Sequence, residues 1–180
     1  MKNYKIVLLA LIISLFSCKN KVETSTGKLK VVTTTTMITD MIQAIGGDKI
    51  EVQGLMGSGV DPHLYKASEG DVGKLSNADM IFYNGLHLEG KLEDVFKKMQ
   101  ASKKEVVALA EAINPAQLIQ SVNFASSYDP HIWFNIDYFI KMSEYMTSEL
   151  SELNPENAET FKNNSEAYIA KLKSLETDVK

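Results

Sequence analysis

The sequence has 180 residues, of which 44% are hydrophobic and 23% are charged, and its net charge is −4 at pH 7. This composition excludes a disordered chain and suits one globular domain or one lobe of a larger protein. An acidic chain without a stripe of basic residues also excludes nucleic acid as a partner.

Residues 1–17 have the pattern of a secretory signal peptide, with a basic start and an apolar run at 6–16 that is too short to span a bilayer. The run ends at Leu-Phe-Ser-Cys, which is similar to a bacterial lipobox, in which the cysteine becomes the lipidated N-terminus. Cys18 is the only cysteine, which excludes an intrachain disulfide. We therefore predict an extracytoplasmic protein, in the periplasm or on the cell surface, anchored to the membrane through Cys18. The polar residues 18–28 are then a flexible tether.

From residue 29 the pattern alternates between strand-like and helical segments. The predicted strands are 28–36, 49–56, 79–85 and 104–113. The predicted helices between them are 37–45, 68–77 and 88–100. Ser68 and Asp71 form a capping-box pattern at the start of the second of these helices. Alternation of this kind predicts the α/β class, with a four-stranded parallel sheet flanked by helices.

Two further helices are predicted near the C-terminus, the first over 136–153 and the second beginning with Asn154 and Pro155. The apolar stripe of the second helix contains Phe161, Tyr168, Leu172, Leu175 and Val179. No glycine or proline stop signal precedes Lys180. The pattern fits either a terminal helix or the beginning of a long connecting helix. We expect a lobe over 29–153 followed by this helix at 154–180.

The tripeptide Asp-Pro-His occurs twice, at Asp61–His63 and at Asp129–His131, in a chain with three histidines. Each copy follows a predicted strand, and ligands of parallel sheets bind beyond the carboxyl ends of the strands. Imidazole is the commonest metal ligand among side chains. We therefore predict that His63 and His131 meet at one metal ion, with Asp61 and Asp129 orienting the rings. A turn-forming Asp-Pro also occurs without a metal, and two ligands do not complete a site.

The third histidine, His87, follows the strand predicted at 79–85 and competes for the same role. Its neighbours are Leu86 and Leu88, which favours a structural histidine that is packed or lies at the start of a helix. We therefore expect His87 not to bind the metal.

The segments "GVDPHLYKASEGDVGKLSNADMIFYNGLHLEGKLEDVF" and "YDPHIWFN" resemble the substrate-binding lipoproteins of bacterial zinc and manganese ABC importers, the TroA-like family (solute-binding protein family 9). The resemblance covers residues 29–180. It implies two α/β lobes joined by one long helix, with the metal between the lobes. It also implies that His63 and His131 are ligands, that His87 is not, and that Trp133 lies near the lobe interface.

The resemblance further implies a membrane permease as partner, a monomeric receptor, and a third and fourth ligand from a second lobe that lies beyond Lys180. Many zinc-specific members carry a histidine-rich loop before the second Asp-Pro-His, whereas residues 114–127 contain no histidine. This difference favours manganese or mixed specificity, so the expected ion is Zn²⁺ or Mn²⁺.

Other functions were weighed against this one. A zinc hydrolase needs a third protein ligand and a general base, and the sequence has neither HExxH nor G-x-S-x-G. A nucleotide-binding protein would carry G-x-G-x-x-G after the first strand, where "VVTTTTM" stands. A surface adhesion or scaffold lipoprotein remains as the alternative. The prediction is a non-catalytic, lipid-anchored metal receptor.

Overall fold

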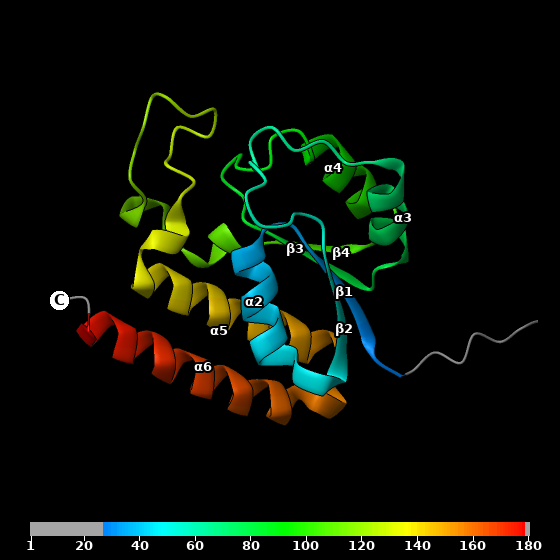
Figure 1. The fold of residues 1–180 in the computed structure, drawn as a ribbon, viewed down its shortest axis with the longest axis vertical. Helices are drawn as coiled ribbons and strands as arrows, with labels where there is room; N and C mark the ends of the chain where they lie inside the picture. Colours follow the sequence, from blue (N-terminus) through cyan, green and yellow to red (C-terminus); the bar gives the residue numbers. More distant parts are fainter. Residues whose placement is uncertain (1–26, 179–180) are drawn as a thin grey trace, which may run out of the picture.

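The computed structural model describes residues 27–178 as a parallel sheet with helices on both faces (Figure 1). The predicted signal peptide, Cys18 and most of the predicted tether lie outside the described residues. The strands are β1 (Leu29–Thr33), β2 (Ile50–Gly54), β3 (Met80–Tyr83) and β4 (Glu105–Ala108), in the order β2-β1-β3-β4. All three strand pairs are parallel. The predicted α/β class with a four-stranded parallel sheet is thus confirmed.

Within residues 27–178, five α-helices connect and follow the strands. They are α2 (Thr36–Gly46), α3 (Glu69–Asn77), α4 (Glu93–Ala101), α5 (Ile136–Leu153) and α6 (Ala158–Asp178). The capping box of α3 is present as predicted, since the Asp71 N–H donates to the Ser68 hydroxyl and the Asp71 carboxylate accepts from the Ser68 N–H. Helix α5 has the bounds that the sequence pattern predicts.

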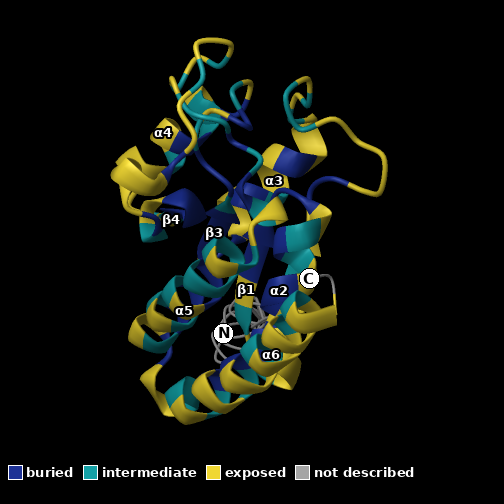
Figure 2. Ribbon diagram, turned by 90° about the vertical axis from the view of Figure 1, so that its left-hand side faces the viewer, coloured by how far each residue is buried: buried dark blue, intermediate teal, exposed yellow. Residues whose placement is uncertain are grey.

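The sheet separates two apolar clusters because successive side chains of a strand point to opposite faces. Val31 and Phe82 pack with helices α2, α5 and α6, whereas the adjacent Val32 and Ile81 pack with α3 and α4. Figure 2 shows the buried interior between these layers and the exposed loops at one end of the sheet. These loops follow the carboxyl ends of the strands and include the Asp-Pro-His segments.

The chain reverses direction across the sheet at β1. From β1 it passes outward to β2, and then returns to β3 on the other side of β1. The loops on either side of such a switch point diverge, which leaves a crevice beyond the carboxyl ends of the strands. The sheet order therefore places the ligand crevice next to β1 and β3.

The helix predicted over 88–100 begins at Glu93, and the prediction for the last strand was also too long. The strand predicted over 104–113 ends at Ala108, and residues Leu109–Ala112 form a 3-10 turn. Leu109 and Ala110 are buried in the core, so this turn has an apolar pattern that resembles the end of a strand. The predicted apolar stripe of α6 is buried only in its first part, since Phe161 is fully buried and Leu175 is 50% exposed.

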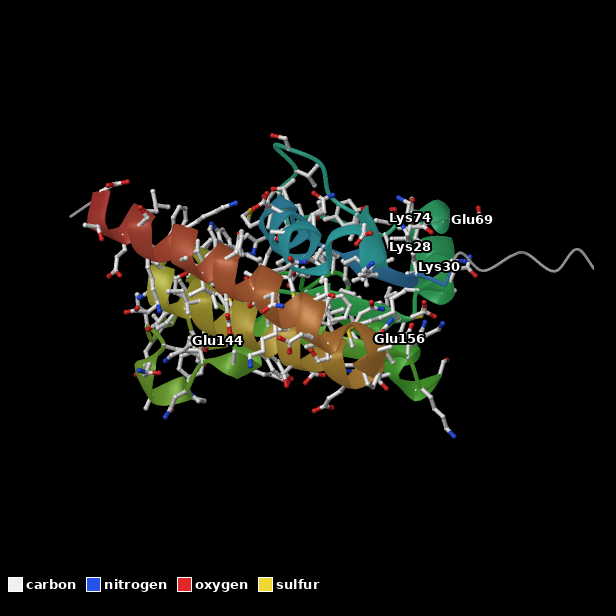
Figure 3. The ribbon with its side chains drawn as sticks, turned by 90° about the horizontal axis from the view of Figure 1, so that it is seen from below. Lys28, Lys30, Glu69, Lys74, Glu144 and Glu156 are labelled. Carbon is white, nitrogen blue, oxygen red and sulfur yellow. The ribbon has the colours of Figure 1, made fainter. Side chains whose placement is uncertain are left out.

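Helix α6 runs back along α5 after a short turn at Pro155–Asn157, so its carboxyl end returns toward the beginning of α5 (Figure 3). Figure 3 also shows Lys28 and Lys30 where the described chain begins. Among residues 27–178, no helix is both long enough and apolar enough to cross a membrane.

Candidate metal centre

The two Asp-Pro-His segments form the same local turn. In the first, the backbone N–H of His63 donates to Asp61 Oδ1 at 2.9 Å. In the second, the backbone N–H of His131 donates to Asp129 Oδ1, also at 2.9 Å. An aspartate that accepts from the backbone two residues on is a common turn, and proline fixes the backbone dihedral between the two. Each histidine is therefore held on a stiff backbone.

The two imidazoles meet, with His63 Nε2 and His131 Nε2 3.4 Å apart. Their loops follow β2 and β4, which are the opposite edges of the sheet. Three strand spacings, about 14 Å in all, separate such edges. Both loops therefore bend inward over the central strands to bring the rings together. The predicted proximity of His63 and His131 is thus found in the fold.

The ring of His131 is oriented by a carboxylate. Asp129 Oδ1 lies 2.7 Å from His131 Nδ1, on the side of the ring away from His63. A proton on Nδ1 satisfies this contact and leaves the Nε2 lone pair free. The pKa of Asp129 is lowered, mainly by the hydrogen bond from the backbone N–H of His131. Partial burial acts in the opposite direction, and the hydrogen bond and charge of the His131 imidazole lower the pKa further. Asp129 is therefore suited to remain an anion.

Asp61 differs from Asp129 because its hydrogen bond reaches only the backbone N–H of His63. The His63 loop is held farther along, where the Tyr65 hydroxyl donates to Leu55 O at 3.1 Å and to Asp71 Oδ2 at 2.8 Å. Burial and the Asp71 contact raise the pKa of Tyr65 to about 12. The loop is thus tied to β2 and to the first turn of α3.

Aromatic rings surround the two imidazoles. Phe124 stacks on His63, with ring centroids 6.3 Å apart and 12° between the planes. Trp133 meets the ring of His131 edge-on at 5.2 Å. A cavity of about 410 Å³ opens between the two histidines and the residues that follow β1, including Thr35 and Met37. Trp133 lines this cavity and is half-buried, so it is not a core tryptophan.

The spacing of the two nitrogens is compatible with a shared ion. Two nitrogens bound to zinc at about 2.0–2.1 Å with a tetrahedral angle are roughly 3.3–3.4 Å apart. Within residues 27–178, no group of three or more His, Cys, Asp and Glu residues could hold a metal. The described residues therefore supply two candidate ligands, His63 and His131, and not a complete metal site.

His87 lies apart from this pair. Its Nδ1 is 2.5 Å from Glu93 Oε1, and its side chain is 42% exposed. Of the two structural roles expected for His87, packed or at a helix start, its place beside the first residue of α4 agrees with the second.

Two polar residues near the site were missed from the sequence. The Asn84 amide donates to the carbonyl of Pro130, directly before His131, and the Asn84 backbone N–H donates to the carboxylate of Glu89. Both residues are buried. Glu89 stands in a charged segment that otherwise predicts solvent exposure, so no signal in the sequence marks it.

An α/β lobe whose sheet edge brings together two histidines from Asp-Pro-His turns defines the class of TroA-like solute-binding proteins. The chain belongs to the family described as zinc-uptake complex component A, periplasmic, whose model matches residues 31–180.

Relatives of known name agree with this family. The chain is 43% identical to the manganese-binding lipoprotein MntA of Bacillus subtilis over 83% of the chain and 48% of the relative. It is 40% identical to the zinc-binding protein TroA of Treponema pallidum, over 86% of the chain and 49% of the relative. The solved structure of that periplasmic TroA matches with a TM-score of 0.80 and 40% identity, over 85% of the chain and 54% of TroA. The chain thus spans about half the length of these relatives.

Proposed function

We propose that this chain is the metal-binding lobe of an extracytoplasmic lipoprotein that serves an ABC importer. It binds Zn²⁺ or Mn²⁺ through His63 and His131, and the ion passes to a membrane permease. The observation that carries the proposal is the 3.4 Å distance between the two Nε2 atoms, from loops at opposite edges of the sheet. The carboxylate behind His131 supports it further.

The choice of ions follows from the relatives. One is named a manganese-binding lipoprotein and another a zinc-binding protein. A Mn-bound periplasmic protein of Candidatus Liberibacter asiaticus also shares the fold, with a TM-score of 0.72 and 29% identity over 80% of the chain and 53% of that structure. The absence of histidine from residues 114–127 favours manganese or mixed specificity.

Several further features belong to the proposal. Residues 1–17 are a signal peptide, Cys18 carries the lipid, 18–28 form the tether, and 154–180 begin a helix that connects the lobe at 29–153 to another. The receptor is monomeric and does not catalyse a reaction. The described residues supply no third His, Cys, Asp or Glu to complete a metal site, so only His63 and His131 are assigned as ligands.

The test is a competition titration of the full chain with Zn²⁺ and with Mn²⁺. His63→Ala and His131→Ala should each weaken binding by at least tenfold, since each removes one of two ligands. His87→Ala is the matched control, because it removes an exposed histidine outside the cavity and should leave the affinity unchanged. Unchanged affinity in the double variant His63→Ala/His131→Ala would refute the site.

Two assays separate the alternatives. A scaffold lipoprotein would bind its partner equally well after both substitutions. A hydrolase would cleave a model ester in a reaction that His63→Ala abolishes. The proposal expects metal binding to be lost and no ester cleavage in any variant.

A further inference from the structure

Glu89 is a buried carboxylate that the proposed site does not use. It lies between β3 and α4 and is only 2% exposed. Charged side chains are rarely buried this completely without a partner, because the loss of hydration disfavours the charged form. Among the ion pairs of the described residues, none involves Glu89. Hydrogen bonds therefore hold it in place.

Three donors converge on the two oxygens of Glu89. The Thr34 hydroxyl and the Asn84 N–H donate to Oε1 at 2.7 and 2.8 Å. The Gly85 N–H donates to Oε2 at 3.2 Å. Burial raises the pKa of Glu89, whereas these donors act in the opposite direction. Thr34 directly follows β1 and Asn84 directly follows β3, so one carboxylate joins the ends of the two central strands.

The backbone before Glu89 is shaped to turn it inward. Gly85, Leu86 and His87 have φ angles of 87°, 52° and 63°, all in the left-handed region. Left-handed backbone is unfavourable for residues other than glycine, because the Cβ comes close to the following carbonyl oxygen. The turn leaves His87 exposed and delivers Leu88 and Glu89 into the interior. Strain of this kind persists where the surrounding structure holds it, and it clusters near functional sites.

Asn84 extends this network to the second Asp-Pro-His segment. Its Nδ2 donates to Pro130 O at 3.0 Å, across 46 residues of sequence. Proline has no N–H, so the carbonyl is the only backbone group of Pro130 that a neighbour can hold. The Asn84 carbonyl also accepts from the Ala110 N–H at 2.9 Å, which fixes Asn84 beside the end of β4. His131 follows Pro130 directly.

We propose that Glu89 and Asn84 are positioning residues that fix the backbone of His131 at the metal site. Glu89 holds Asn84, Asn84 holds Pro130, and Pro130 carries His131. This role rests on the proposed metal-binding function. It also makes the two ligands unequal, because the network holds Pro130, directly before His131, whereas it meets the chain before His63 at Met56, whose N–H donates to Thr34 O at 3.0 Å. The His63 loop itself is held by Tyr65 and Asp71.

The size of the effect follows from similar groups in metal proteins. Removing a partner that orients a ligand costs about 10–100-fold in metal affinity. Asn84 acts through the backbone and not through the ring, so we expect the lower end of that range. Glu89→Gln keeps one acceptor oxygen but turns an NH₂ group toward a backbone N–H. We expect it to lower the metal affinity less than Asn84→Ala does.

The test uses Asn84→Ala in the full chain, because it removes the link to Pro130 and keeps the backbone bond to Glu89. Zn²⁺ affinity should fall about tenfold, as measured by competition titration. The matched control is Phe161→Leu, which disturbs the core at α6, where Phe161 is fully buried. It should lower the melting temperature and leave the affinity unchanged. An equal loss of affinity in both variants would reduce Asn84 to a general stabilising role and overturn the proposal.

A second readout needs no metal. Hydrogen exchange of the backbone amides at 131–135 in the metal-free chain should accelerate in Asn84→Ala, while those at 63–65 should not change. Unchanged exchange at 131–135 would overturn the positioning role. If the unsubstituted chain binds neither Zn²⁺ nor Mn²⁺, the proposed function fails, and the exchange result alone decides whether Asn84 positions His131.

Discussion

A single oxygen of Asp129 contacts His131 twice, since Oδ1 accepts from the backbone N–H at 2.9 Å and lies 2.7 Å from Nδ1 of the ring. One carboxylate therefore sets both the turn of the chain and the orientation of the imidazole. Asp61 makes only the first of these contacts with His63. Both copies of the tripeptide thus fix the histidine backbone in the same way, and only the second copy also contacts the imidazole ring.

This difference predicts unequal effects of two matched substitutions. Asp61→Ala and Asp129→Ala each remove one hydrogen bond from a histidine N–H, but only Asp129→Ala releases a ring. We expect Asp129→Ala to lower Zn²⁺ affinity by about 10–100-fold and Asp61→Ala to have a smaller effect. Competition titration of the two variants measures the difference. Equal losses would show that the ring contact does not contribute to binding.

Asp71 predicts a specific dependence of stability on pH. Burial would raise its pKa, but hydrogen bonds from Ser68, Tyr65 and Lys74 prevail and hold that pKa well below the ordinary value of 3.8. As the pH falls below about 4, the unfolded chain takes up the proton before the folded one, so the folded state loses stability. Above that pH the contribution of Asp71 is fully present.

Asp71→Asn should therefore lower stability at pH 7, by about 1 kcal/mol as for a lost cap, and flatten the decline between pH 4 and pH 2. Urea unfolding at a series of pH values measures both effects. Asp94→Asn is the control, since the Asp94 side chain is 91% exposed. A decline as steep in Asp71→Asn as in the unsubstituted chain would contradict the assignment.

We expect the two ends of helix α6 to contribute unequally to the free energy of unfolding. Phe161 is fully buried against α2 and α5, so Phe161→Ala should cost about 3–5 kcal/mol in the free energy of unfolding. Leu175 is 50% exposed, so Leu175→Ala should change that free energy by less than about 0.5 kcal/mol. Denaturant unfolding of both variants measures the contrast. A large cost at Leu175 would mean that another surface covers the end of α6 in solution.

The sequence predicted the parts of the fold that depend on local patterns. The capping box at Ser68 and the turn that begins with Asn154 and Pro155 follow from side chains that bond to nearby backbone. The end of β4 was not predictable, because Leu109 and Ala110 are apolar for their place in the core and not for a strand.

The meeting of His63 and His131 was predictable from a rule about parallel sheets, because that rule needs only the order of strands and loops. The roles of Asn84 and Glu89 were not predictable. Their contacts join residues 46 and 55 positions apart. Asn84 stands at the end of a predicted strand, and Glu89 stands in a segment whose charged character predicts exposure. Only the three-dimensional course of the Gly85–His87 turn reveals that Glu89 is buried.

The two histidine loops leave from opposite edges of the sheet, and 68 residues separate the rings. In the proposed complex, a single ion would therefore close a long loop of chain, as a disulfide does, and restrict the unfolded chain in the same way. The transported ion would then act as a removable cross-link of the protein that carries it. Its release to a permease would leave the lobe less stable than before, which disfavours an empty carrier and favours reloading.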